Sequence, residues 1–510
     1  MAAAMEPVRG VGVARLAGLL AQDVLAARQG TDTAERTMGA QRHRARRIRM
    51  TMEALGPLYI KVGQVLATRP DLVSGALILE LERLHTTVSV APFSVFEPVL
   101  EQELGRRWEK LFREVDVGLP CGSASLAQVY PVVLHDGSRA VLKVQRPGAE
   151  ARMRADMAAL SRAARMTGRA LPRLAEVLDL DAILQGIFDC MSPELDFTAE
   201  AAHMETGRRA AEGFRYLTVP AVRQAGRRVL IQGLARGRAL SAGAAEDLCE
   251  EQRERVGAEL LRYMYRGYFV EHFFHADPHP GNVFLHPETG ATLIDWGMAG
   301  RIDRHTGTLG ALAFTSIAHN DARGLAAAWL ELGRSTPRTD LPGFRDDLTR
   351  VVPRLAASRL DGMNFGSALA TILRCAARRG IRTNPMIGML GKSMANVEGT
   401  VRGIAPNLSA TDVFRETLVD IMAELARKYL SYEQVARQGL ELIAVGDSAL
   451  DEVRAALRML AGRENTTRAE PWPSQRTGGD GLGPVGQHGI AAATWVFAAW
   501  AVHRVTRHAP

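Results

Sequence analysis

Two polar clusters in the second half of the sequence carry residue types suited to phosphoryl transfer. They are residues 275–282 (HADPHPGN) and residues 293–297 (LIDWG). Transfer of a γ-phosphoryl group concentrates negative charge, so the protein must fix Mg²⁺ with hard oxygen ligands and orient the acceptor oxygen with a carboxylate. Asp295 and Asn282 suit the metal, and Asp277 suits the acceptor. The two clusters therefore predict a site for ATP or ADP with Mg²⁺.

The segment between the clusters predicts the element that holds them together. Apolar residues 283–285 and 292–294 flank the turn-forming residues 287–290 (PETG), a pattern typical of a β-hairpin. Such a hairpin would bring both clusters to one place. Their spacing also matches protein kinases, in which the catalytic Asp precedes a metal-binding Asn by five residues and an Asp-Phe-Gly follows.

A lysine on a predicted strand supplies the third component. Residues 121–130 (CGSASLAQVY) predict a loop of small residues that opens into a strand, and residues 140–147 (AVLKVQRP) predict the next strand, with Lys143 on it. In a kinase N-lobe this lysine reaches the α- and β-phosphates. The loop residues that we expect to contact the nucleotide are Ser123, Ala124, Ser125, Ala127 and Gln128.

An acidic partner for Lys143 follows in residues 192–200 (SPELDFTAE), which have the features of a helix start. We expect Glu200 to project from this helix and to form an ion pair with Lys143. Glu194 lies six residues earlier and so would emerge on a different face of the same helix. An alternative stays open, in which these carboxylates only complement the helix dipole.

Together these motifs resemble the UbiB/AarF family of atypical protein-kinase-like proteins, which is linked to coenzyme Q biosynthesis. The resemblance covers about residues 45–410. It rests, in chain order, on residues 61–64 (KVGQ), the loop 122–128, Lys143, residues 194–196 (ELD), Glu200, the loop 275–282, residues 295–297 (DWG), residues 391–393 (GKS) and residues 398–406.

The resemblance implies a bilobal α+β kinase-like fold with a small β-containing N-lobe, an α-rich C-lobe and a helical N-terminal extension packed over the active site. It implies that Lys61 pairs with Glu194 and that both, with Gln64, line the nucleotide site. Two residues depart from the family pattern. Ala127 stands where the family has glycine, and Gly122 stands where alanine is common, so the preference between ATP and ADP stays open.

Patterning divides the chain into segments. We expect a helical extension over residues 1–115, an N-lobe over 116–235, a helical C-lobe over 236–463, a disordered linker over 464–488 and a hydrophobic segment over 489–510. In the C-lobe, aromatic residues 268–274 should pack in the core. Helices are predicted near residues 246–267, 309–318, 325–332, 344–355, 365–377, 413–430 and 433–444.

The net charge of +7 rests on arginine far more than on lysine and favours an anionic partner. A nucleotide or a membrane surface suits it, whereas the lack of interleaved aromatic residues argues against nucleic acid. Residues 11–27 predict an amphipathic helix rather than a secretory signal. Residues 489–502 are apolar, but they are shorter than the roughly 20 residues that span a bilayer.

These features predict a protein on the cytoplasmic side of a membrane, either peripheral or anchored through its C-terminus, with lipid or quinone-pathway partners. A homodimer is one option. Two other functions stay open. One is a nucleotide-switched binding module without phosphotransfer. The other is a metal hydrolase, because the spacing of His275, Asp277 and His279 can ligate a transition metal.

Overall fold

A computed structural model provides the structure of the chain. It describes residues 12–13, 15–20, 22–23, 35–67, 73–81, 83–84, 90–124, 126–170, 184–185, 188, 192–336, 339–357 and 365–429. The chain divides into two compact units, Met1–Tyr429 and Leu430–Pro510, and every described residue belongs to the first. Four of the predicted features lie outside the described residues: the helix at 433–444, the linker, the hydrophobic C-terminal segment and Ser125.

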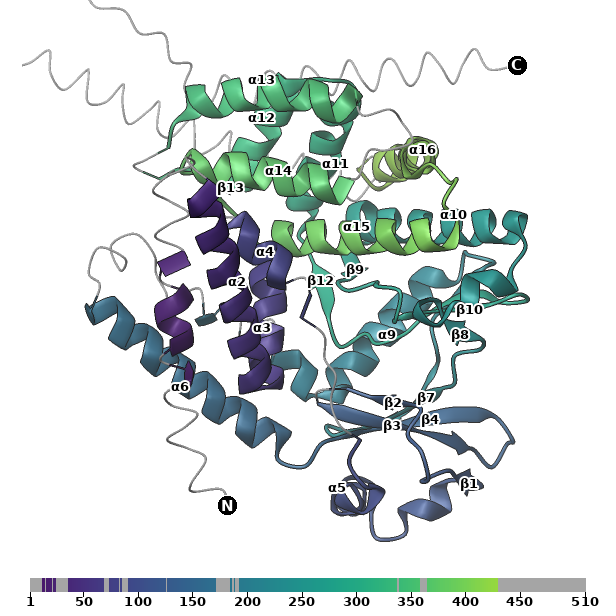
Figure 1. Cartoon of the computed structure of the whole chain (residues 1–510). Helices are drawn as coiled ribbons and strands as arrows, with labels where there is room; N and C mark the ends of the chain where they lie inside the picture. The colour runs from purple at the N-terminus through teal and green to yellow at the C-terminus, as the bar shows by residue number, and fades with distance from the viewer. Residues whose placement is uncertain are drawn as a thin grey trace, which may run out of the picture. The chain divides into compact units, whose positions relative to one another are not determined.

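The N-terminal extension is built from helices α2 (Glu35–Leu55), α3 (Pro57–Ala67) and α4 (Gly75–Leu81), which contact one another and share a core with α6 (Ala149–Ala170). Figure 1 shows the first three as neighbouring purple helices. Gly63 makes this packing possible, because a Cβ atom there would lie 2.3 Å from Leu84 Cδ1. The glycine of residues 61–64 therefore has a packing role.

The described part of residues 12–23 is helical and amphipathic, as predicted. Val13, Leu16 and Leu19 are buried in the core of the extension. Asp23, which interrupts the apolar run, is also buried, and its two carboxylate oxygens accept hydrogen bonds from the backbone N and the Oγ of Ser74, both at 3.0 Å. This polar residue therefore ties the first segment to the start of α4.

The N-lobe sheet has the strand order β1-β3-β4-β7-β6, with β2 paired to β3. Its strands are β1 (Glu114–Val115), β2 (Gly122–Ser123), β3 (Ala127–Val133), β4 (Arg139–Gln145), β6 (Val222–Ala225) and β7 (Val229–Gly233). On β4, Leu142 and Val144 enter an apolar core shared with α5 (Glu97–Leu104). Lys143 alternates with them and so points to the opposite face, toward α9 (Phe197–Ala211).

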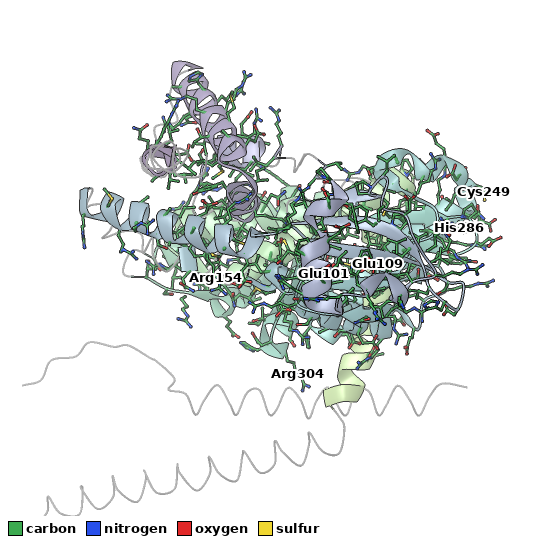
Figure 2. The ribbon with its side chains drawn as sticks, turned by 90° about the horizontal axis from the view of Figure 1, so that it is seen from below. Glu101, Glu109, Arg154, Cys249, His286 and Arg304 are labelled. Atoms are coloured by element: carbon green, nitrogen blue, oxygen red, sulfur yellow. The ribbon has the colours of Figure 1, made fainter. Side chains whose placement is uncertain are left out.

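Solvent faces the outer sides of the helices beside this sheet. Glu101 on α5 and Arg154 on α6 are exposed and mark those sides in Figure 2. The acidic and basic side chains of α6 pair with each other along the helix, as in the Arg154–Glu150 pair at 2.8 Å. One face of the sheet therefore packs on the apolar core under α5, and the other packs toward α9, where Lys143 lies among apolar residues of the sheet and of α9.

The predicted hairpin between the two polar clusters is confirmed. Strands β10 (Val283–His286) and β11 (Gly290–Leu293) pair antiparallel, with Val283 opposite Leu293. They belong to a sheet of order β5-β11-β10-β8, completed by β5 (Leu217–Thr218) and β8 (Arg238–Ala239). A separate pair, β9 (Phe273–His275) and β12 (Ala299–Arg301), brackets both polar clusters.

The C-lobe is mainly helical. Its helices are α10 (Glu250–Arg266), the π-helical turn η6 (Gly267–Glu271), α11 (Arg304–Ala318), α12 (Ala322–Leu332), α13 (Leu341–Ala357), α14 (Phe365–Arg378), α15 (Pro385–Ile404) and α16 (Ala410–Tyr429), which surround one apolar core. The helices predicted within residues 309–377 and at 413–430 match α11–α14 and α16. The aromatic residues Tyr268, Phe269 and Phe274 are buried in the core, as predicted. Helix α15 is one that the sequence patterns did not predict.

Candidate functional site

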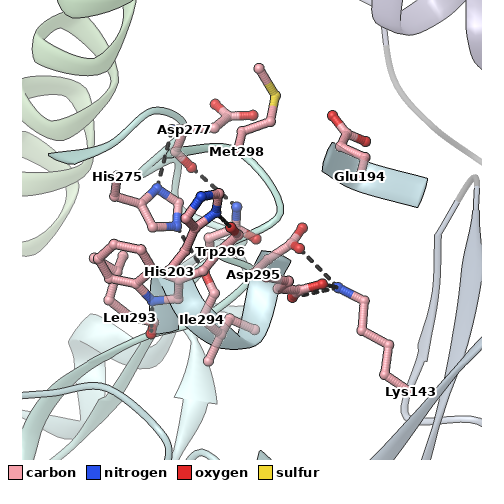
Figure 3. Close-up of polar contacts among 12 residues, drawn as sticks. Lys143, Glu194, His203, His275, Asp277, Leu293, Ile294, Asp295, Trp296 and Met298 are labelled. Atoms are coloured by element: carbon pink, nitrogen blue, oxygen red, sulfur yellow. Dashed lines mark hydrogen bonds and ion pairs between the residues drawn. The ribbon is translucent and has the colours of Figure 1, made fainter. Parts of the chain in front are cut away.

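Lys143 is the centre of the site. Its Nζ donates to both carboxylate oxygens of Glu200 on α9, at 2.8 and 2.9 Å, and to Oδ1 of Asp295 at 3.0 Å (Figure 3). The expected ion pair with Glu200 is therefore present, and a second pair with Asp295 joins it. Three elements that are distant in the sequence, β4, α9 and the loop after β11, meet at this ammonium group.

The charges at this junction reinforce one another. The nearby Lys143 ammonium holds the pKa of Asp295 well below its usual range. Burial would lower the pKa of Lys143, but the charges of Asp295 and Glu200 outweigh it and raise the pKa. Burial raises the pKa of Glu200, and the Lys143 ammonium, which donates to both of its oxygens, opposes that rise.

Asp295 is held in an unusual backbone conformation. Its φ of 58° lies in the left-handed region, which is costly for a residue other than glycine. The next residue, Trp296, is fully buried; it stacks on Phe273 with an interplanar angle of 9° and donates from Nε1 to the carbonyl of Leu293 at 3.2 Å. The buried indole anchors the loop and so fixes the direction of the Asp295 carboxylate.

Helix α9 packs directly on that indole. A Cβ atom at Gly207 would lie 2.4 Å from the Trp296 ring, so only glycine allows this approach. His203, one turn earlier, contacts the carbonyl oxygen of Trp296 through Nδ1 at 3.0 Å. The helix that carries Glu200 is therefore seated on the loop that carries Asp295.

The first cluster forms a tight loop between β9 and β10. His275 is fully buried, and burial lowers its pKa. Its Nδ1 accepts from the backbone N of Asp277 at 3.1 Å, so its Nε2 carries the proton and donates to the carbonyl of Ile294 at 3.0 Å. A neutral histidine thus connects the two clusters and shapes the loop around Asp277.

Asn282 and Asp295 lie close together and fit Mg²⁺. The backbone N of Ile294 donates to the carbonyl of Asn282 at 2.9 Å. The Asn282 amide donates from Nδ2 to the carbonyl of Asp277 at 3.1 Å, so its Oδ1 is the atom that could face a metal ion. Mg²⁺ commonly binds one or two carboxylates together with phosphate oxygens and water. A half-exposed Asp295 beside an oriented amide meets that requirement.

The arrangement of the histidines does not favour a metal hydrolase. Both ring nitrogens of His275 are engaged with the backbone, and His279 accepts from the N of Gly281 through Nδ1 at 3.0 Å. Across the described ranges, no group of three or more His, Cys, Asp or Glu side chains is arranged to hold a metal ion.

Helix α15 holds Asp277 from the other side. Asn396 donates from Nδ2 to Asp277 Oδ1 at 2.6 Å, and Lys392 Nζ lies 3.5 Å from the same oxygen. Ser393 donates to the carbonyl of His275 at 2.6 Å, and Thr400 donates to that of Pro278 at 2.8 Å. We did not predict Lys392 and Asn396 as site residues, although Asn384 and Pro385 form a cap and first-turn signal for this helix.

The N-terminal extension reaches the site through Lys61. Its Nζ donates to Glu194 Oε1 at 3.0 Å, as the family resemblance implies, and lies 4.0 Å from the sulfur of Met298. Burial would lower the pKa of Lys61, but Glu194, Asp295 and Asp277 together raise it. Gln64 contacts the carbonyl of Leu84 at 3.5 Å, which places its amide within the extension. A nucleotide role for Gln64 stays a prediction.

One expectation about Glu194 is wrong. Glu194 and Glu200 do not share a helix, because Glu194 lies in a separate 3₁₀ turn, η3 (Ser192–Leu195). Helix α9 starts after Asp196, whose carboxylate caps it by accepting from the N and the Oγ1 of Thr198 at 2.9 and 2.6 Å. The cap starts a new helix and lets Glu194 turn toward Lys61.

The loop of small residues is held by Arg146 at the end of β4. Arg146 donates to Ser123 Oγ at 2.8 Å and to the carbonyl of Ala124 at 3.1 Å. Ala127 is buried in the core. Gln128 is also buried, and its amide pairs with the backbone of Ala91 at 2.6 and 3.0 Å. Ser123 thus ends β2 and Ala124 follows it in the loop, whereas Ala127 and Gln128 support the loop from β3.

Comparisons with known proteins agree with this geometry. Residues 83–329 match the ABC1 atypical kinase-like domain, and residues 348–409 match the UbiB helical domain. The chain is 30% identical to a probable protein kinase UbiB of Cellvibrio japonicus over 72% of its own length and 67% of that protein. It is 29% identical to an uncharacterized protein of Synechocystis sp. over 68% and 87% of the two lengths.

A solved structure shows the same fold. The structure of Rv3197 from Mycobacterium tuberculosis in complex with erythromycin superimposes with a TM-score of 0.52 at 20% sequence identity and covers 75% of this chain and 97% of the other. Within the part of the chain that the structure describes, none of the helices has the length and apolar content needed to cross a membrane.

Proposed function

Because the chain belongs to the ABC1/UbiB family of atypical kinase-like proteins, we propose that it is a phosphotransferase or ATPase that uses ATP and Mg²⁺. The observation that carries this proposal is the position of Lys143, which bridges Glu200 and Asp295 with contacts of 2.8 to 3.0 Å. This bridge has the composition that phosphoryl transfer requires, a fixed cation beside a metal-binding carboxylate.

In this function each residue has a distinct role. Lys143 holds the α- and β-phosphates, and Glu200 fixes the direction of its side chain. Asp295 and Asn282 hold Mg²⁺, which when bound neutralises charge on the phosphate oxygens. Asp277 orients the acceptor, a hydroxyl group or water, and takes its proton. A bond forms from the acceptor oxygen to the γ-phosphorus while the bond to the β–γ bridging oxygen breaks, and ADP leaves with that electron pair.

The family resemblance supports a role in isoprenoid-quinone or related lipid metabolism at a membrane. Exposed basic side chains on α2, among them Arg42, Arg46 and Arg47, offer positive charge to an anionic membrane surface. The acceptor is therefore expected to be membrane-associated.

The test measures nucleotide affinity and phosphate release with and without membrane vesicles, for the parent protein and for Asp295→Asn. We expect the parent to bind Mg·ATP and to release phosphate, and the variant to lose turnover by about 100-fold because one metal ligand loses its charge. Equal binding and turnover in the two proteins would contradict the metal role of Asp295.

One observation favours a second function. Lys61 pairs with Glu194 at 3.0 Å, and Asp295 pairs with Lys143 at 3.0 Å, so the charges of the site are mutually satisfied. A nucleotide-switched binding module would use nucleotide to rearrange these pairs without transfer. Tight Mg·nucleotide binding with no phosphate release, even with lipid vesicles or quinone head-group analogues, would support that function.

A further inference from the structure

We propose that Lys392 on α15 binds the γ-phosphoryl group of the nucleotide, as a third lysine of the site beside Lys143 and Lys61. This inference rests on the proposed function, since it assigns a ligand atom within the same site. Helix α15 belongs to the segment that matches the UbiB helical domain, beyond the kinase-like match at residues 83–329. The helical domain would then contribute directly to phosphate binding.

The face of α15 that carries Lys392 is the face that meets the catalytic loop. Lys392, Asn396 and Thr400 follow one another at intervals of four residues, and side chains at that spacing lie on one side of a helix. All three contact the loop, two at Asp277 Oδ1 and one at the carbonyl of Pro278. The ammonium group is therefore delivered to the catalytic carboxylate by a firmly attached helix.

The two contacts at Asp277 Oδ1 differ in strength. Asn396 donates at 2.6 Å, a close hydrogen bond that fixes the carboxylate. Lys392 lies at 3.5 Å, well beyond the roughly 2.7–2.9 Å that is typical of a charge-assisted hydrogen bond. Asn396 thus keeps Asp277 in place when Lys392 leaves it, and a flexible lysine stem can carry the ammonium to a nearby phosphate.

The other two lysines of the site are committed. Lys143 donates to Glu200 and Asp295 at 3.0 Å or less, and Lys61 donates to Glu194 at 3.0 Å. Among the described lysines of the site, Lys392 has the longest contact with its partner. Catalysis of phosphoryl transfer needs positive charge at the oxygens where negative charge develops, and Lys392 is the cation placed next to the acceptor carboxylate.

Residue usage gives independent support. The chain has 63 lysines and arginines, and only five are lysines: Lys61, Lys110, Lys143, Lys392 and Lys428. Three of those five ammonium groups meet at one site. In the described residues, the carboxylates of the site form ion pairs with lysines and form no ion pair with an arginine. These carboxylates are Glu194, Glu200, Asp277 and Asp295.

This choice of lysine has a chemical reason. An ammonium group is a compact point charge with rotatable donors, whereas a guanidinium is a planar fork that suits fixed bidentate pairs. This chain uses arginine for most of its basic residues but has a lysine at position 392. The ammonium group of that lysine can move between a carboxylate and a phosphate. A solvated surface charge would give no such preference.

The test compares two nucleotides that differ in the γ-phosphate. Calorimetric titration measures the affinities of Mg·ADP and of the non-hydrolysable Mg·AMP-PNP for the parent, Lys392→Met, Lys143→Met and Lys110→Met. We expect Lys392→Met to weaken AMP-PNP binding by about tenfold and to leave ADP binding within about twofold of the parent. Lys143→Met should weaken both, since it acts on the α- and β-phosphates.

Lys110→Met is the matched control, because it removes an exposed lysine of the N-lobe outside the site. Lys392→Gln provides a second variant that keeps a polar head, should Lys392→Met fold poorly. Equal losses for both nucleotides, or no loss for either, in a folded Lys392 variant would overturn the inference and leave the proposed function standing. If the parent binds neither nucleotide, the proposed function fails, and the inference fails with it.

Discussion

The two sides of the site are held by different forces. On the N-lobe side, charge joins Lys143 on β4 to Glu200 on α9 and, across the lobes, to Asp295 in the loop after β11. On the C-lobe side, Asp277 is held by hydrogen bonds from a single helix, with Asn396 at 2.6 Å as the closest. Charged contacts between elements can exchange when a charged ligand binds, whereas neutral bonds from one helix keep their geometry. We infer that nucleotide binding exchanges the charged contacts, which include the Lys392–Asp277 pair, and that the neutral hydrogen bonds from α15 keep their geometry.

The largest effect that would test this difference is the loss of Lys143. Glu200 has a side chain that is only 3% exposed, so Lys143→Met leaves a buried carboxylate without its cation. We expect the free energy of unfolding to fall by about 3–5 kcal/mol, measured by urea denaturation.

The double variant Lys143→Met/Glu200→Gln should recover most of that loss, because the uncompensated charge is gone. Lys110→Met serves again as the matched control. If Lys143→Met were as stable as Lys110→Met, charge would not be what holds the N-lobe side together.

A second prediction concerns the joint between the two sides, where α9 sits on Trp296. A Cβ atom at Gly207 would lie 2.4 Å from the indole ring. We expect Gly207→Ala to destabilise the protein by about 2 kcal/mol through overpacking, measured as a shift in the urea midpoint.

The companion variant Gly207→Ala/Trp296→Phe should regain part of that stability, because the smaller ring makes room. Gly39→Ala is the control, since a Cβ there meets nothing within 4 Å and alanine favours the helix. A neutral Gly207→Ala would show that the α9–Trp296 contact is loose.

The third prediction addresses how α15 is anchored on its far side. Glu398 is buried and accepts from the backbone N of Phe365 at 2.9 Å, at the start of α14. Burial raises its pKa to about 8, against the lowering effects of the α14 backbone and Arg402. At pH values between the unfolded pKa of about 4.5 and the folded pKa of about 8, Glu398 is protonated in the native state and ionised in the unfolded state. The native state therefore binds more protons than the unfolded state, and the free energy of unfolding falls as the pH rises through this range.

We expect the parent to lose about 1.4 kcal/mol of unfolding free energy between pH 6 and pH 7 from this group alone. In Glu398→Gln that part of the slope should vanish, because the amide does not titrate. Denaturation curves at the two pH values measure the difference. An unchanged slope in Glu398→Gln would mean that Glu398 is already ionised in the native state.

The N-lobe side could be predicted from the sequence because its elements carry strong local signals. The strand patterns at residues 121–130 and 140–147 placed Lys143, and the hairpin followed from two apolar runs around PETG. The Lys143–Glu200 and Lys61–Glu194 pairs rested on family resemblance as well as on helix signals. Their catalytic roles, like those of Asp277, Asn282 and Asp295, remain predictions for experiment.

The α15 side was harder because its helical signal is weak. Four glycines lower its helix propensity: Gly388, Gly391, Gly399 and Gly403. Gly391 is there for packing, since its Cβ would lie 3.0 Å from Leu369. Residues 391–393 were part of the family resemblance, but only the rarity of lysine could have pointed to a role for Lys392 in the site.

Other differences came from tertiary contacts that no local pattern shows. Asp196 caps a new helix and so separates Glu194 from Glu200, which overrides the expectation of one continuous helix. Gln128 is bound by the backbone of Ala91, 37 residues away, rather than facing the loop.

The central claim is that Lys143 and Asp295 act on one bound Mg·nucleotide. The most direct test is a double-mutant cycle on Mg·ATP affinity with the parent, Lys143→Met, Asp295→Asn and the double variant. Since the two side chains are 3.0 Å apart, we predict that the double variant loses less than the sum of the single losses, with a coupling of about 1–3 kcal/mol. Strictly additive losses would mean that the two residues serve separate sites, and would contradict the account.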